Sequence, residues 1–300
     1  MRIGVMIGAD GTNNTLDDVI GVAKGAEAAG LDNVWLANIF SFDAITTLAL
    51  IGRETEQIGL GTAVTPTYPR HPTAIAQQAL TTAAATNNRF TLGIGLSHQI
   101  VIEGMLGMSY DKPAKHMREY LSVLMPLARG EQADFQGEHY KVAGVNLDIP
   151  GAERMPVVIA ALGPTMLKLA AQMADGTNTW MVGPNTMESH IIKTMHDAGN
   201  DAPTVVAGLP IVLTTNIDQA KEQIAQTLTI YGQLPSYRAM LDREGAAGPA
   251  DIAIVGDENK LRGEIQRFAD MGVTDFNAAI VPTEDGAYER TLDFLASVVQ

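Results

Sequence analysis

The chain has 300 residues, 46% of them hydrophobic, which is enough to bury a large core. Its formal net charge of −14 disfavours nucleic acids and anionic membranes as partners, because their phosphates attract basic surfaces. It has no cysteine, which excludes disulfides and thiolate metal sites. The strand-like start at Arg2–Ile7 lacks the pattern of a signal peptide, and no apolar run approaches the ~18–20 residues of a membrane helix, so we expect a cytoplasmic protein.

Apolar, β-rich segments alternate with amphipathic helical segments along the chain. Strands are predicted near residues 3–7, 33–37, 57–64, 90–96, 156–161, 177–182, 205–213 and 275–281. Helices are predicted near residues 15–29, 43–54, 72–86, 113–129, 164–174, 185–198, 218–231, 258–271 and 284–299. This alternation over about 250–300 residues predicts an α/β protein with a (β/α)8 TIM barrel. A doubly wound sheet is the alternative, but the loop Gly8–Asn14 after the first strand lacks the GxGxxG spacing.

Capping residues support these helix boundaries. Thr15 or Asn14 can cap the first helix, and Gly30 follows its last periodic residue. Asp17 and Asp18 lie in the first turn, where they favour the helix dipole and are not expected to be catalytic. Prolines stand where four later helices are predicted to begin: Pro72, Pro113, Pro164 and Pro184.

Two regions depart from the alternation. Residues 130–155 form an insertion, within which residues 133–142 predict a hairpin that turns at Gly137. Residues 234–256, rich in glycine and alanine, form a second insertion. Since no linker, repeat or charge block divides the chain, residues 1–300 are expected to form a single domain.

Two loops at the ends of predicted strands carry the polar residues of a candidate enzyme site. Residues 59–72 run from a strand through a loop with Tyr68 and Arg70 into a helix, and residues 90–99 leave a strand and reach His98. Because ligand groups collect at the carboxyl ends of parallel strands, these loops indicate an active site.

His98 is the first candidate for a proton donor, because it ends a strand and a histidine has an unperturbed pKa of about 6.5. Tyr68 is a second candidate. Four other histidines are expected to lie at the surface or in the packing: His116, His139, His190 and His196. None of them shows a metal-binding spacing such as HExxH, so no metal site is predicted.

The chain resembles the bacterial luciferase-like superfamily, and within it the branch of oxidoreductases that use the deazaflavin coenzyme F420. The resemblance is carried by short motifs that follow one another in the expected order: Leu60–Thr65, Arg70-His71-Pro72, Leu92–Gly95, Asp134–Tyr140, Pro156–Pro164 and Ala174–Gly176. It implies a barrel with the coenzyme ring across the carboxyl ends of the strands.

The resemblance also implies where the coenzyme lies. The third strand would end in a bulge with a non-proline cis peptide at Ala63-Val64, a wedge that bends the reduced ring and presents its C5 hydride. The loop and helix start at Ala161–Met166 would hold the phosphate through free N–H groups. The coenzyme contacts implied in this way are Asn38, Ala63, Val64, Thr65, Gly95, Ser97, His98, Ala161, Leu162, Gly163, Pro164, Thr165 and Met166.

The chain departs from the sugar-phosphate dehydrogenases of this superfamily. Their catalytic histidine after the second strand is matched by Ile39, which cannot transfer protons, and their glutamate after the fourth strand is matched by His98. We therefore favour hydride donation from reduced F420 to a small or medium apolar acceptor with a C=C, C=N or C=O bond. The substrate side would be apolar, lined by Phe40, Phe42, Trp180 and Met181.

Several alternatives stay open at this point. His98 either donates a proton or only hydrogen-bonds coenzyme ring atoms. Arg70, His71 or Lys168 could lie near the coenzyme tail, although structural or surface roles are the simpler expectation.

Three functions fit the chain: an F420-dependent reductase, an FMN-dependent monooxygenase of the same superfamily, or a non-catalytic protein that binds F420 or flavin. The first would need an F420-reducing enzyme as its hydride source. The apolar helices near residues 43–51 and 72–86 could form the interface of a homodimer.

Overall fold

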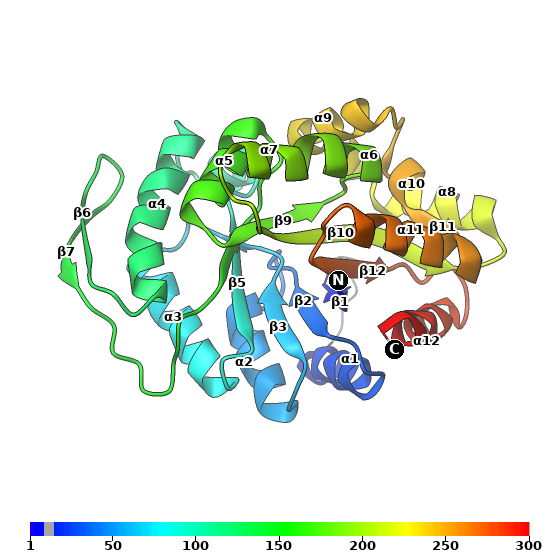
Figure 1. Ribbon diagram of the computed structural model, residues 1–300, viewed down its shortest axis with the longest axis horizontal. Coiled ribbons are helices and arrows are strands. Elements are labelled where there is room, and N and C mark those ends of the chain that lie inside the picture. The colour runs from blue at the N-terminus through cyan, green and yellow to red at the C-terminus, as the bar shows by residue number, and fades with distance from the viewer. Residues whose placement is uncertain (9–14, 300) are drawn as a thin grey trace.

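The computed structural model describes residues 1–8 and 15–299, and within them eight parallel strands close into a barrel (Figure 1). The strands, in barrel order, are β1 (Arg2–Ile7), β2 (Asn33–Leu36), β3 (Gly59–Thr62), β5 (Phe90–Gly95), β8 (Val157–Ile159), β9 (Gly176–Trp180), β10 (Thr204–Leu213) and β12 (Asp275–Ile280). The barrel closes because β12 pairs with β1 and β9 pairs with β10. The predicted barrel is confirmed, and a doubly wound sheet is excluded because such a sheet has open edges.

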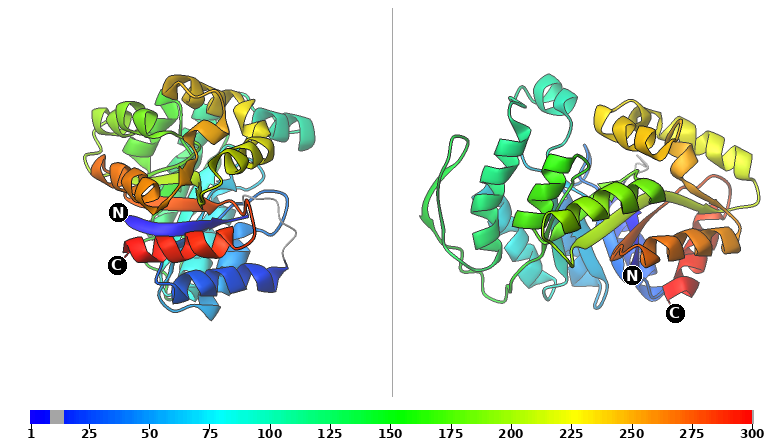
Figure 2. Two further views of the ribbon diagram at one scale, coloured as in Figure 1. Left: turned by 90° about the vertical axis from the view of Figure 1, so that its right-hand side faces the viewer. Right: turned by 45° about the horizontal axis from the view of Figure 1, so that its top comes forward.

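Helices surround the barrel, as Figures 1 and 2 show. Eight of them follow predicted segments: α1 (Leu16–Ala28), α2 (Ala44–Glu54), α3 (Pro72–Ala85), α4 (Pro113–Ala128), α5 (Pro164–Met173), α8 (Ile217–Thr227), α11 (Glu258–Asp270) and α12 (Ala287–Val299). Thr15 caps α1 in a capping box with Asp18, and Gly30 after it has a φ of 83°. The alternative cap Asn14 and most of the loop Gly8–Asn14 lie outside the described residues.

Two regions outside the predicted helices are helical, and the helix predicted at residues 185–198 is present in three parts. A π-helix, η1 (Ile100–Met105), follows β5, and the segment after β9 divides into α6 (Pro184–Thr186), a π-helix η2 (Met187–Ile192) and α7 (Lys193–Asp197). The second insertion folds into α9 (Pro235–Glu244), α10 (Pro249–Ile252) and β11 (Ile254–Gly256), the last paired with β10. Gly245, with a φ of 79°, ends α9. The glycine marks a helix end there, because the left-handed conformation favours glycine.

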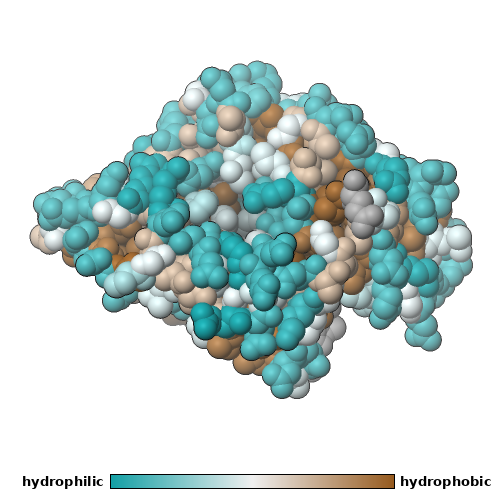
Figure 3. Space-filling model, turned by 60° about the horizontal axis from the view of Figure 1, so that its bottom comes forward, coloured by the Kyte–Doolittle hydropathy of each residue, from teal (hydrophilic) through white to brown (hydrophobic). Residues whose placement is uncertain are grey.

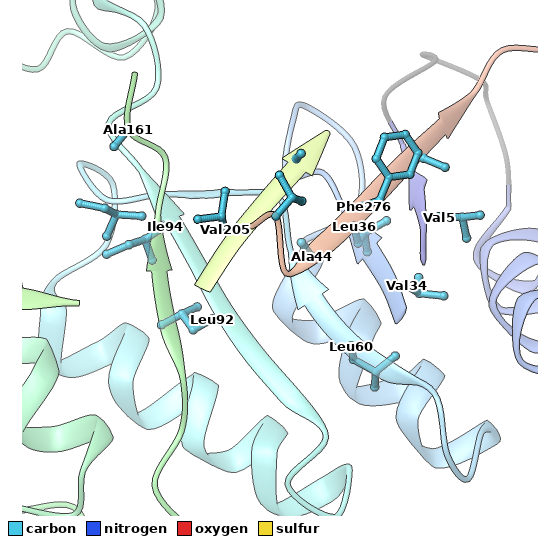
Figure 4. Packing of buried hydrophobic residues seen from close by; sticks show 14 of the residues in the cluster. Val5, Val34, Leu36, Ala44, Leu60, Leu92, Ile94, Ala161, Val205 and Phe276 are labelled. Atoms are coloured by element: carbon cyan, nitrogen blue, oxygen red, sulfur yellow. The ribbon is translucent and has the colours of Figure 1, made fainter. Parts of the chain in front are cut away.

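The core has two parts. A large cluster lies between strands and helices, where Val34, Leu60 and Leu92 point outward from neighbouring strands (Figure 4). A small cluster of Trp35, Val158 and Val206 fills the barrel itself. Glycine is needed at position 61, because a Cβ there would lie 2.3 Å from the indole ring of Trp35. The barrel interior is therefore filled by the flat ring of Trp35, for which Gly61 leaves room.

The predicted hairpin is confirmed as β6 (Ala133–Gln136) and β7 (Lys141–Val145), which lies beside α4 and away from the barrel (Figures 1 and 2). The buried carboxylate of Glu119 on α4 accepts hydrogen bonds from the backbone N–H groups of Glu138 at 3.1 Å, His139 at 2.7 Å and Tyr140 at 3.2 Å. Burial alone would raise the pKa of Glu119, but these three donors lower it overall. Glu119 therefore fixes the hairpin turn against the helix.

Hydrophilic residues cover most of the face in Figure 3, with smaller hydrophobic areas between them, consistent with the net charge of −14. In residues 1–8 and 15–299, no helix is long and apolar enough to cross a membrane.

We predict that Glu119→Gln lowers the free energy of unfolding by about 1–3 kcal/mol at neutral pH, because a charged acceptor of several N–H groups is lost. The native pKa of Glu119 is lowered, so its contribution is present above the ordinary glutamate pKa of about 4.3 and fades as the pH falls through the lowered value. Urea unfolding at neutral pH and below about pH 3 should therefore show a difference that shrinks in acid.

The matched control is Glu138→Gln, whose exposed carboxylate lies between Lys112 and Lys115 on the hairpin side of the same helix. Its unfolding midpoint should stay close to that of the wild type, because exposed ion pairs contribute little. An equal loss in both variants would show that Glu119 has no special role in holding the hairpin.

Candidate active site

Half-buried apolar residues stand at or near the carboxyl ends of several barrel strands. They come from β1, from the end of β3, from the end of β8 and from β9: Met6, Ala63, Val64, Ala160 and Trp180. All are apolar or aromatic, and most are small. In (β/α)8 barrels this is the face where ligands bind.

The end of β3 carries the bulge that the resemblance implied. The strand stops at Thr62 and resumes as β4 (Thr65–Pro66), and the peptide bond between Ala63 and Val64 is cis. Val64 packs tightly against β5, since a Cβ on Gly95 would lie 2.6 Å from a methyl group of Val64. Ala63 and Val64 thus lie side by side at the open end of the barrel, with Gly95 directly against them.

His98 lies just beyond the end of β5. Ser97, with a φ of 61°, turns the chain, and the carbonyl of His98 accepts from the N–H groups of Val101 at 2.9 Å and Ile102 at 3.0 Å as η1 begins. The imidazole is half-buried, and burial lowers the pKa of His98, so the ring is mainly neutral at neutral pH. A ring that is still partly exposed can exchange protons with solvent.

A chain of ring contacts joins the end of β5 to the end of β9. The ring centroids of His98 and Tyr237 lie 5.7 Å apart, those of Tyr237 and Tyr231 lie 5.3 Å apart, and those of Tyr231 and Trp180 lie 6.0 Å apart. We call these four residues the aromatic arch. Because β8 pairs with β5 on one side and β9 on the other, the arch joins the two strands that flank β8.

The sequence did not indicate Tyr231 and Tyr237 as candidate site residues. Tyr231 lies in a 3-10 turn, η3 (Thr229–Gly232), and Tyr237 lies in α9, both within or beside the second insertion. Of the four residues predicted to line the substrate side, Trp180 belongs to the arch, while Met181 is completely buried and presents no surface to a substrate. Phe40 and Phe42 are exposed on the loop before α2, at 67% and 37%.

The loop after β8 offers N–H groups to an anion. Gly163 and Thr165 are exposed at the start of α5, and the N–H groups of Gly163, Thr165 and Met166 have no hydrogen-bond partner within the described part of the chain. Free N–H groups and the helix dipole favour negative charge at such a position.

His190 orients this loop, a role that the sequence did not reveal. The buried ring of His190, on η2, donates from Nε2 to the carbonyl oxygen of Leu162 at 2.8 Å. Because a trans peptide places its C=O and N–H on opposite sides, this bond turns the N–H of Gly163 away from His190. The interaction joins segments 28 residues apart in the sequence, so no local pattern announces it.

Tyr68, the second predicted proton donor, lies in a different environment. Its ring stacks on that of His116 with centroids 4.0 Å apart and planes at 5°, and on that of Tyr110 at 5.3 Å. The Tyr68 hydroxyl is buried and has no partner within the described residues, and burial raises the pKa of Tyr68 above its ordinary value. Tyr68 therefore keeps its proton, but this hydroxyl is closed off from solvent.

The cations and amides near the site mostly hold neighbouring loops in place. Arg70 forms an ion pair with Asp43 at 2.8 Å, and His71 caps α3. Asn38 accepts a hydrogen bond at 3.0 Å from the first residue of α2, and Lys168 is exposed on α5. Lys168 and His71 are exposed, and Lys168 lies on the helix that begins after Gly163.

Comparison with known proteins identifies relatives along the whole chain. A family model described as luciferase-like monooxygenase matches residues 1–299. A Mycobacterium tuberculosis protein whose name contains the words coenzyme F420-dependent oxidoreductase is 32% identical over 189 residues, which make up 59% of this chain and 54% of that protein. The 5,10-methylenetetrahydromethanopterin reductase of Archaeoglobus fulgidus is 30% identical over 77% of this chain and 70% of its own length.

A solved structure shows the same fold. The coenzyme F420 dependent tetrahydromethanopterin reductase of Methanopyrus kandleri superimposes with a TM-score of 0.82 and 19% identity, covering 99% of this chain and 98% of that one. The first of the two sequence relatives is matched over only about half of its length, at 54%.

Proposed function

Because the chain belongs to the luciferase-like monooxygenase family, we propose that it is an F420-dependent oxidoreductase. Its reaction would be hydride transfer from reduced F420 to a small or medium apolar acceptor with a C=C, C=N or C=O bond. The names of both sequence relatives, one an F420-dependent oxidoreductase and one a reductase, support this assignment. The structural observation that carries it is the packing of Val64 and Ala160 against Gly95 at the carboxyl end of the barrel, on the segment that leads into the exposed start of α5.

The residues present fit such a coenzyme. Ala63, Val64 and Ala160 would form a flat apolar floor for the ring, since none of them carries a long or charged side chain. The N–H groups of Gly163 and Thr165 would hold the phosphate, so the coenzyme's negative charge is met by backbone dipoles in a chain with an excess of acidic residues.

When bound, reduced F420 supplies a hydride with its electron pair. The acceptor then also needs a proton, and His98 would deliver it from an imidazole that solvent can recharge, because the ring is half-buried. Ile39, at the position of the histidine of the sugar-phosphate dehydrogenases, is 49% exposed and has no group that could replace His98. The buried Tyr68 hydroxyl is the weaker candidate.

The same proposal includes an F420-reducing enzyme as hydride source and a cytoplasmic setting. It also includes a homodimer formed through α2 and α3, supported by the apolar side chain of Leu50 on α2, which is 43% exposed, and by the exposed Ile39 and Phe40 in the loop before α2. Sedimentation at micromolar concentration that shows only a 31.9 kDa species would contradict the dimer.

We predict that F420 binds more tightly than FMN, and more tightly than a deazaflavin that lacks the phosphate. Gly163→Pro should weaken F420 binding about tenfold or more, because it removes one N–H that would donate to a charged oxygen. The backbone tolerates the change, since Gly163 has a φ of −78° and proline requires about −65°. Titrations that follow the fluorescence of Trp180 would measure these affinities.

Gly163→Ala is the matched control, because it keeps the N–H and its Cβ would meet nothing within 4 Å. It should bind F420 as the wild type does, and neither variant should change binding of the phosphate-free deazaflavin. Preference for FMN would favour the monooxygenase that the family description names, with O₂ as co-substrate. Binding without turnover with any acceptor would favour a non-catalytic binding protein.

We also predict that His98→Gln lowers the turnover number by about 10²- to 10⁴-fold while coenzyme affinity is kept. The acid form of His98 is required, and its pKa is lowered, so the wild-type rate should fall as the pH rises from below about 6.5, and the variant should lack this dependence. Steady-state rates across pH would test this. A variant with unchanged turnover but weaker coenzyme binding would instead show that His98 only contacts the coenzyme.

A further inference from the structure

The aromatic arch consists of ring surfaces and neutral hydrogen-bond donors. Tyr231 meets Trp180 and Tyr237 edge to face, at interplanar angles of 76° and 79°, so ring edges and faces alternate along it. Such contacts also suit a further flat ring placed against them. As whole residues, all four members of the arch are intermediate between buried and exposed.

Three charged side chains of α9, those of Arg238, Asp242 and Glu244, take part in hydrogen bonds or ion pairs. Arg238 pairs with Asp242 at 2.8 Å and donates to the carbonyl oxygens of Ala246 and Ala247. Glu244 accepts from the N–H groups at the start of α6, at 3.0 and 2.6 Å. These bonds engage Arg238, which follows Tyr237 in the chain, and Glu244 at the end of α9.

The tyrosine hydroxyl groups of the arch can act as hydrogen-bond donors. Burial raises the pKa of both Tyr231 and Tyr237, so their hydroxyl groups stay protonated. The indole N–H of Trp180 is buried, as the Tyr68 hydroxyl is, so Trp180 contributes its ring rather than a donor. Uncharged donors suit an acceptor oxygen such as a carbonyl, and Arg238, the cation next to Tyr237 in the chain, is already paired with Asp242.

We propose that the aromatic arch is the substrate-recognition surface and that it selects flat, uncharged, conjugated carbonyl compounds such as aryl ketones or cyclic enones. The inference rests on the proposed function and narrows its acceptor. The ring of the substrate lies against Tyr231 and Trp180, and its carbonyl oxygen accepts from the Tyr237 hydroxyl beside His98. Tyr231 and Tyr237 are thereby specificity-determining residues.

Reduction of an aryl ketone at this site would require one hydride and one proton. Reduced F420 would supply the hydride for the new C–H bond at the carbonyl carbon. The oxygen, which takes the π pair of the C=O bond, would accept a proton from His98. The ketone is reduced to the alcohol, and reduced F420 is oxidised. His98 then regains its proton from solvent.

Binding of two ketones of equal carbon count tests the proposal without turnover. Acetophenone has a flat ring, and cyclohexyl methyl ketone has a puckered one. Ligand-observed NMR titration of the protein saturated with oxidised F420 should give about threefold to tenfold tighter binding of acetophenone. Tyr231→Leu should abolish this preference. Tyr237→Phe should weaken both ketones about threefold to tenfold and leave the preference intact, because it removes only the hydroxyl.

Ile230→Ala is the matched control, because Ile230 neighbours Tyr231 but is 62% exposed and outside the arch. It should leave both affinities unchanged, and unfolding midpoints should confirm that every variant is folded. Equal binding of the two ketones to the wild type, or a preference that survives Tyr231→Leu, would overturn the proposal.

The proposed function and the proposed role of the arch can be contradicted independently. If F420 does not bind, the proposed function fails, and the same titrations on the coenzyme-free protein still compare the ketones on the arch. If F420 binds and is turned over while the ketones are not distinguished, the function stands and the arch has no role in selection.

Discussion

Pairing of β12 with β1 closes the barrel, and the rest of the structure depends on this closure. Polar contacts of the buried Asp275 hold the seam at the amino end: Asp275 accepts from Asn33 of β2 at 2.9 Å and pairs with the exposed Arg2 of β1 at 2.8 Å. Because all strands are parallel, closure brings their carboxyl ends into one ring. The bulge at Ala63-Val64, His98 and the loop of Gly163 meet at this end for that reason alone.

Small residues let large rings lie across the barrel. Gly61 leaves room for the Trp35 ring, which fills the interior, and Gly208 leaves room for Trp180, since a Cβ there would lie 3.0 Å from its ring. A filled interior gives the open end a solid base. The floor at Ala63, Val64 and Ala160 is therefore backed by close packing rather than by a solvent channel.

In the proposed site, the group that would bind the coenzyme's phosphate and the groups that would bind the substrate lie on different elements. An anion would be met by backbone N–H groups at α5, which His190 orients through the carbonyl of Leu162. The arch above β8 offers neutral donors and ring surfaces. Arg70, which the sequence suggested as a residue near the coenzyme tail, forms an ion pair with Asp43. A chain with a net charge of −14 can in this way bind an anionic coenzyme without a basic patch.

The sequence by itself determined the barrel, the order of its strands and most helix boundaries, because periodicity, proline at helix starts and a glycine such as Gly30 act within a few residues. The resemblance located the bulge and the loop of Gly163. Only the tertiary structure brought Tyr231 and Tyr237 between His98 and Trp180, enclosed the Tyr68 hydroxyl and joined His190 to Leu162. Contacts of this kind link residues far apart along the chain and exist only once the closed sheet and its helices have fixed the distances between them.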